Sequence, residues 1–166
     1  WQLFVMYCGY VGFFAFGFND GIHLNYAACN YDEEIQKKFG TFLRFIGLMS
    51  LVESILLLII IPIVLSDKNE EFDILIVVVA NIIPTTILGL FSYLNQCTLR
   101  FKYYSIANVV DKILFGVVLI GLLSFRIRSI MPYIISFTAT RYIAIIYHIS
   151  TSKEVFTSNP LPFISL

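Results

Sequence analysis

Charged residues are scarce in this chain of 166 residues: Asp, Glu, Lys and Arg make up 13%, whereas 58% of the residues are hydrophobic and the mean hydropathy is +0.84. Ordinary soluble domains carry roughly 25% charged residues and about 45–50% apolar ones. So large a surplus of apolar side chains needs a second apolar phase, because too little polar surface remains to cover them in water. The composition excludes an ordinary soluble domain and predicts an integral membrane protein.

The sequence also lacks an excess of basic residues and a cysteine spacing typical of disulfide or zinc-binding proteins. Eleven Lys and Arg residues balance eleven Asp and Glu residues, so the chain has no net positive charge with which to bind nucleic acid. Cys8, Cys29 and Cys97 are odd in number and show no CxxC spacing, which indicates neither a disulfide framework nor a zinc site. We predict no nucleic acid partner, no metal and no cofactor.

Long apolar runs predict an all-α fold, a polytopic bundle of transmembrane helices over residues 1–150. About 20 helical residues cross roughly 30 Å of hydrocarbon, and runs without period-two alternation favour helices over barrel strands. The run at 113–125 is short and crosses the membrane only if its helix starts near Ile106. We expect about five spans, near residues 1–18, 42–65, 74–94, 106–125 and 130–147.

The distribution of Lys and Arg between the spans predicts the orientation of the bundle. Segment 66–73 has one Lys against four acids. Basic residues gather before the second span, between the third and fourth, and in the polar tail at 151–166; these are Lys37, Lys38, Arg100, Lys102, Lys112 and Lys153. We expect this basic side to face the cytoplasm, although Arg126 and Arg128 break the pattern. The opening at Trp1 has no signal-peptide pattern, and we expect the chain to be a piece of a longer protein.

Glu53 lies almost at the midpoint of the second expected span, where a buried charge costs at least about 2.5 kcal/mol. Ser50, Glu53 and Ser54 stand at helical spacing on one face, which we expect to point at protein or water rather than lipid. One interpretation is a cavity-lining carboxyl that is protonated or paired during transport. The other is a neutral buried carboxyl hydrogen-bonded to a neighbouring helix.

The third and fifth spans also carry polar residues. Pro84 frees the carbonyl of Ala80, so we expect a kink beside Asn81 and Thr85 that either bends round a pathway or is purely structural. Arg141 is near enough to the cytoplasmic end for its side chain to reach the interface. Alternatively it points inward, where it would meet an anionic headgroup and pair with Glu53. The pathway candidates are Glu53, Ser50, Ser54, Asn81, Thr85 and Arg141.

The segment between the first two spans contains two local signals. Asn19-Asp20-Gly21 predicts a tight turn, since these residues supply the side-chain bonds and positive φ that a turn requires. Asp32 predicts the N-cap of a short helix over residues 33–39, acidic at its start and basic at its end. Local physics therefore predicts an ordered cytoplasmic element.

The motif Gly17-Phe18-Asn19-Asp20-Gly21-Ile22, followed by Leu24-Asn25-Tyr26 and Tyr31-Asp32-Glu33, resembles the segment after the second membrane helix of bacterial oligosaccharide flippases. These polysaccharide-biosynthesis transporters belong to the superfamily that includes multidrug and toxin extrusion proteins. Asn95-Gln96 with Arg100, Lys102 and Tyr104 is similar to the loop after the family's fourth helix. The resemblance covers roughly residues 5–150 by pattern, and it makes Asn19, Asp20, Gly21, Asn25 and Tyr26 the cytoplasmic loop motif.

The resemblance implies a fold of two six-helix halves, of which this chain supplies helices from the first. It implies a substrate, undecaprenyl-pyrophosphate-linked oligosaccharide, that moves from the inner to the outer leaflet of the cytoplasmic membrane for surface polysaccharide such as O-antigen or capsule. Membrane lipid and the polymerase and glycosyltransferases of the same pathway are the implied partners. The family commonly has a basic residue and a Gly pair where this chain has Asn25, Ala27 and Ala28, which argues against a pyrophosphate grip in this loop.

Two other classes of function stay open. A membrane-embedded polysaccharide polymerase or acyltransferase would need a reactive group near the membrane surface, and His23 and His148 are the only histidines, in two distant segments. A non-catalytic scaffold subunit would use the small-residue face of Gly9, Gly12 and Ala15 to bind a partner span. We expect a transporter, not an enzyme, with no catalytic residues.

Overall fold

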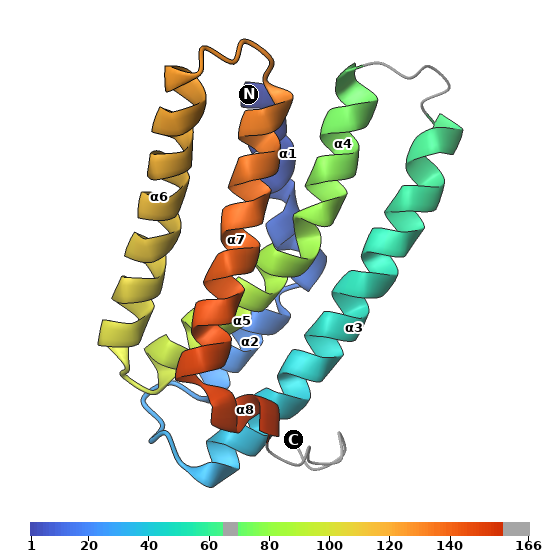
Figure 1. The fold of residues 1–166 in the computed structure, drawn as a ribbon. Coiled ribbons are helices and arrows are strands. Elements are labelled where there is room, and N and C mark those ends of the chain that lie inside the picture. Colours follow the sequence, from blue (N-terminus) through green and yellow to red (C-terminus); the bar gives the residue numbers. More distant parts are fainter. Residues whose placement is uncertain (65–69, 158–166) are drawn as a thin grey trace.

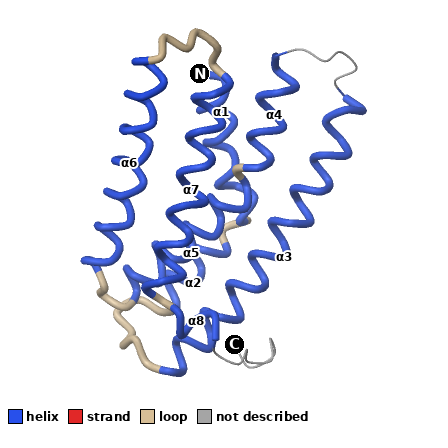
Figure 2. The backbone as a smooth tube through the Cα atoms, viewed as in Figure 1, coloured by secondary structure: helices blue, strands red, loops and turns tan. Residues whose placement is uncertain are grey.

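The protein is all-α in the computed structural model, which describes residues 1–64 and 70–157 and shows no strand in these ranges (Figures 1 and 2). The prediction of an all-α chain is therefore confirmed for the described part. The helices are α1 (Gln2–Val11), the 3₁₀ helix η1 (Gly12–Ala15), α2 (Phe18–Asn25), α3 (Glu33–Val64), α4 (Glu70–Ala80), α5 (Ile82–Cys97), α6 (Phe101–Ser124), α7 (Met131–Thr151) and α8 (Lys153–Thr157).

Three helical segments are long and apolar enough to cross a membrane: Glu33–Val64, Glu71–Cys97 and Phe101–Ser124. The expected span at 106–125 is one of them, because α6 starts at Phe101, five residues before Ile106. The helix of α7 has 21 residues and covers the expected span at 130–147, but it is not among these three. The chain is thus a membrane protein by helix length and composition.

The first expected span is not a single helix, which corrects the prediction for residues 1–18. α1 ends at Val11 after only 10 residues, too short to cross a bilayer. Phe16 (φ 46°) and Gly17 (φ 72°) follow η1 in the left-handed conformation, which ends the helical run. Asn19, Asp20 and Gly21 then lie inside α2, so the predicted tight turn at these residues is wrong and the loop motif is largely helical.

The segments that the charge pattern assigned to the same side of the membrane lie at the same end of the bundle (Figure 1). At one end, called the lower end, lie α2, the start of α3, the connection between α5 and α6, and α8. The other, upper end carries the N-terminus, the start of α4 and the connection between α6 and α7. α6 packs chiefly against α7, whereas α3 packs against α5. Of segment 66–73, residues 66–69 lie outside the described residues.

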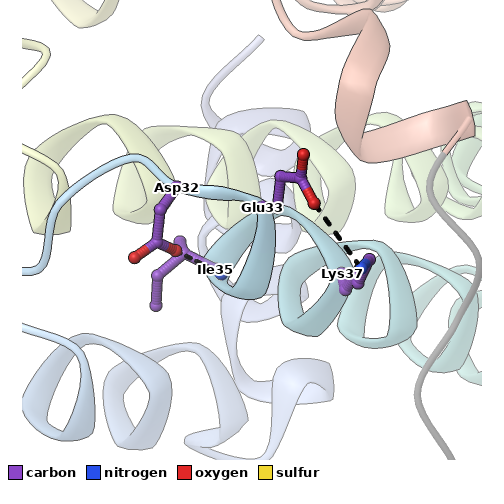
Figure 3. Close-up of polar contacts among 4 residues, drawn as sticks. All are labelled: Asp32, Glu33, Ile35 and Lys37. Carbon is purple, nitrogen blue, oxygen red and sulfur yellow. Dashed lines mark hydrogen bonds and ion pairs between the residues drawn. The ribbon is translucent and has the colours of Figure 1, made fainter.

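The start of α3 is capped as the sequence predicts, but the helix does not stop after two turns. Asp32 Oδ1 accepts a hydrogen bond of 2.9 Å from the backbone N–H of Ile35, and Glu33 lies 3.8 Å from Lys37 (Figure 3). Lys38 pairs with Glu34 at 2.6 Å. α3 then continues through the expected span to Val64.

Aromatic residues form the core of the lower end. Phe39 is fully buried, with its ring centroid 5.7 Å from that of Phe42 and 6.2 Å from that of Tyr26. Phe91 and Leu94 of α5 belong to the same buried cluster. The cluster therefore fastens the α2–α3 connection and the first turns of α3 to α5.

At the lower end, Arg100 joins the α2–α3 connection to α6 and α7. Its guanidinium lies 4.1 Å from the ring centroid of Tyr31 and 4.3 Å from that of Tyr103, and Nη2 donates to the carbonyl of Thr151 at 3.3 Å. Tyr31 donates to Glu154 of α8 at 3.5 Å, and burial raises the pKa of its phenol. The expected polar tail at 151–166 thus starts with the end of α7 and α8, and residues 158–166 lie outside the described part.

The three cysteines supply a test of sidedness without engineering. Cys29 is half-buried in the lower-end connection, whereas Cys97 is buried at the end of α5. A membrane-impermeant maleimide should therefore label Cys29 in inside-out vesicles but not in intact cells. Cys97, which the charge pattern placed on the same side, should react only after denaturation. Labelling of Cys29 in intact cells would invert the orientation.

Candidate functional site

A group of polar side chains lies where α4 meets α5, close to α7 and α1. The two helices of the expected third span are separated at Asn81, which is fully buried, so the predicted kink is confirmed. Asn81 Nδ2 donates to the sulfur of Cys8 on α1 at 3.2 Å, and its Oδ1 has no hydrogen-bond partner. Four residues later, Thr85 faces α7. The kink therefore supplies two adjacent polar groups to the bundle interior.

Arg141 of α7 points at this group rather than along the helix to the interface. Its Nη1 donates to Thr85 Oγ1 at 2.5 Å, and its guanidinium lies 4.6 Å from the ring centroid of Phe137. Thr85 is its one hydrogen-bond partner among the described residues. Since a guanidinium carries five N–H donors, four of them make no such bond to a described residue. The inward interpretation of Arg141 is therefore the one that the structure supports.

Glu53 is not the partner of Arg141, which corrects the sequence prediction. Neither carboxyl oxygen of Glu53 has a hydrogen-bond partner, and both are shielded from solvent. Ser50 donates to the carbonyl of Gly47 at 3.1 Å and Ser54 to that of Ser50 at 2.7 Å, so both hydroxyls bond to their own helix. The three residues share a face of α3 as predicted, but they do not join the group around Arg141.

The acid whose charge reaches Arg141 is Asp111 of α6, a residue that the sequence analysis did not select. The charges of Asp111 and Arg141 interact, although no ion pair within 4.0 Å joins them. Because Asp111 lies next to Lys112 in the sequence, the two residues resemble part of a polar segment that connects two spans. The length of α6 was the signal that could have found it, because a helix starting at Phe101 places residue 111 well inside the bundle.

The carbonyl that Pro84 leaves free has a partner from α7. Tyr142 Oη donates to the carbonyl oxygen of Ala80 at 2.8 Å. A backbone carbonyl without a partner in a membrane protein costs free energy, so this bond stabilises the kink and fixes α7 beside it. Arg141 and Tyr142 thus contact the two sides of the same helix break.

Tyr142→Phe is expected to reduce the free energy of unfolding by about 1 kcal/mol, because it removes this bond and leaves the ring in place. Tyr147→Phe on the same helix is the matched control, since the Tyr147 hydroxyl makes no hydrogen bond to a described residue. Thermal unfolding in detergent compares the two variants. Equal melting temperatures would show that the hydrogen bond from Tyr142 to the Ala80 carbonyl does not stabilise the protein.

An apolar groove runs beside this site between α4 and α7. It has a volume of about 280 Å³ and is lined by Val77, Ala80, Ile135, Thr138, Ala139 and Tyr142. Tyr142 therefore belongs both to the groove and to the helix break. Arg141 does not line the groove, whose apolar surface can accommodate a chain of hydrocarbon.

The loop motif lies at the lower end, away from Arg141. Tyr93 of α5 donates to Asp20 at 2.6 Å, and the His23 ring lies 5.3 Å from that of Tyr93. Asn19 is buried against Gly89, where an added Cβ would approach Asn19 Nδ2 to 3.1 Å. Gly21, Asn25 and Tyr26 belong to α2 and its C-terminal end. These contacts hold α2 against α5.

No family model, no curated protein and no solved structure matches this chain. The arrangement around Arg141 therefore has to be interpreted from its own chemistry. A guanidinium whose other N–H groups make no hydrogen bond to a described residue can bind an anion such as a phosphate.

Proposed function

We propose that this chain forms part of a transporter that moves undecaprenyl-pyrophosphate-linked oligosaccharide across the cytoplasmic membrane for surface polysaccharide synthesis. In this proposal α3, α4 with α5, α6 and α7 cross the membrane, α1 enters it without crossing, and the lower end faces the cytoplasm.

The observation that carries the proposal is the inward position of Arg141. A permanent cation is costly inside a membrane bundle, and such residues mark pathways for substrates or ions. Arg141 is held by Thr85 and Phe137 and keeps four donors for an anion. A pyrophosphate headgroup matches these donors, because guanidinium groups bind phosphate oxygens in pairs.

Two further features support a lipid-linked substrate. Transporters commonly form their binding sites from helices that are interrupted near mid-membrane, as α4 and α5 are at Asn81. The apolar groove between α4 and α7 offers a surface for part of a polyprenyl chain beside the same break. Together with the resemblance of residues 17–33 to oligosaccharide flippases, they favour transport of a lipid over transport of a free ion.

The proposal is tested by complementation. The full-length protein is expressed in cells whose own oligosaccharide flippase gene has been deleted but whose sugar-assembly enzymes remain. Restored surface polysaccharide, with loss of the lipid-linked oligosaccharide that accumulates in the deletion strain, is the expected result. If accumulation persists although the protein is present in the membrane, and the same holds for donors with different sugars, the chain does not flip this class of lipid.

A further inference from the structure

A small cavity lies between α5, α6 and α7, toward the lower end and apart from the groove described above. Its volume is about 40 Å³. On this measure one water needs about 10–15 Å³, so the cavity has room for water. The lining residues are Leu88, Ser92, Ala107, Asn108, Asp111, Ala144 and His148. Four of the seven are polar, and they come from all three helices.

Two of the lining side chains carry buried atoms without a partner. His148 is 2% exposed and its Nδ1 has no hydrogen bond, and Asp111 Oδ1 is shielded from solvent and equally unpaired. A buried polar atom left in this state costs about 1–3 kcal/mol. Native proteins satisfy such atoms with internal water when a polar cavity is beside them. Water bridging Asp111 and His148 would satisfy both.

The surroundings decide which ligand the pair accepts. Within the described ranges no three His, Cys, Asp or Glu side chains gather as a metal site. The charges of Arg141 on α7 and Lys112 on α6 both interact with Asp111, which disfavours a metal cation beside it. A proton, in contrast, needs only a base and an acid joined by water, and the imidazole and the carboxyl are such a pair.

We propose that Asp111 and His148 form a proton-binding site, with the proton shared through water between the imidazole Nδ1 and the carboxylate. The proton is exchanged with water held in the cavity, whose lining includes the exposed Asn108. It binds the Nδ1 lone pair and gives an imidazolium opposite the carboxylate. This proposal is independent of the lipid substrate, since it rests on a different cavity.

Few titratable or charged groups surround His148 and can affect its protonation. From α5 the cavity receives Leu88 and Ser92, neither of which is charged, and Phe91 stacks on the His148 ring at 5.0 Å and 11°. On α7 the Tyr147 ring lies against His148, and on α1 Cys8 interacts with Arg141. Lys153 and Glu154 of α8 are exposed. Asp111 is therefore the one acid that lines the cavity with His148, and protonation there changes the charge that faces Arg141.

The chain has only two histidines, which makes the site directly observable. Full-length protein with ¹⁵N-labelled histidine in lipid nanodiscs gives signals for His23 and His148, assigned with His23→Gln, together with those of any histidine outside this sequence. Each signal is followed from pH 4 to pH 9 in the wild type and in Asp111→Asn. Loss of a carboxylate from the same cavity removes a group that stabilises the imidazolium, so it lowers the titration midpoint of the imidazole.

The expected result is a lower midpoint for His148 in Asp111→Asn and an unchanged midpoint for His23. Equal His148 midpoints in the two proteins, or a His148 signal that does not titrate in either, would overturn the proposal. If Asp111→Asn is not recovered in folded form, the wild type alone decides. Transfer of magnetisation from water protons to His148 Nδ1 is then expected. Absence of this transfer would show that no water reaches the imidazole and would contradict the proposed proton-binding site.

Discussion

Arg141→Gln in the full-length protein is expected to lower export of lipid-linked oligosaccharide by roughly tenfold to a hundredfold. A hydrogen bond to a charged group contributes about 1.5–3 kcal/mol, and each 1.4 kcal/mol is about a factor of ten. Glutamine keeps a polar side chain near Thr85 but loses the charge and the fork of donors that matches pyrophosphate. The measurement is the ratio of surface polysaccharide to lipid-linked oligosaccharide in complemented cells.

Two variants separate a loss of function from a loss of folding. Arg126→Gln makes the same chemical change in the exposed connection between α6 and α7, and it should export normally. Arg141→Lys keeps the charge without the fork and should fall between the two. Normal export by Arg141→Gln at normal membrane levels would remove this residue from the pathway. Reduced levels of Arg141→Gln alone would instead identify a structural role.

Phe39→Ala is expected to cost about 3–5 kcal/mol of unfolding free energy, the range for truncating a buried aromatic residue. Phe39 is fully buried between the rings of Tyr26 and Phe42, and its loss leaves a cavity under the α2–α3 connection. Phe39 lies at the lower end, just before the expected span at 42–65, so water rather than lipid would meet the surface that its truncation exposes.

The matched control is Phe125→Ala, because Phe125 is 81% exposed at the upper end. Its melting temperature in detergent should stay close to that of the wild type, while Phe39→Ala should melt many degrees lower and become sensitive to protease near Tyr26. Similar melting curves for the two variants would show that the aromatic cluster does not hold the lower end together.

The sequence predicted well those features that depend on local chemistry. Asp32 caps α3 because a carboxylate before a helical run accepts from its first free N–H groups, and the third span breaks at Asn81 because Pro84 cannot donate to Ala80. The start of α6 before Ile106 followed from the length that a membrane span requires. None of these outcomes required knowledge of which helices are neighbours.

The features that sequence missed depend on tertiary contacts. Asn19, Asp20 and Gly21 form a helix instead of a turn because α2 packs against α5 through Tyr93 and Gly89. Arg141 meets Thr85 and not Glu53 because α7 packs against α5, while Glu53 lies on α3. Residue spacing within one helix could not decide either pairing.

The small-residue face of the first segment illustrates the same limit. Gly9, Gly12 and Ala15 recur every three residues, but η1 changes the helical repeat, and both glycines have open space around them. No described helix packs closely against these two glycines, and binding of a partner span by this face stays a prediction.

Reconstituted flipping tests the central claim most directly. Purified full-length protein, its Arg141→Gln variant and its Arg126→Gln variant are inserted into liposomes that contain fluorescent undecaprenyl-pyrophosphate-linked oligosaccharide, and a membrane-impermeant quencher reports which leaflet holds the label. Rapid exchange between leaflets with the wild type and Arg126→Gln, and slow exchange with Arg141→Gln, is the predicted result. Exchange no faster than in empty liposomes with the wild type, or equal rates for all three proteins, would contradict a transport pathway at Arg141.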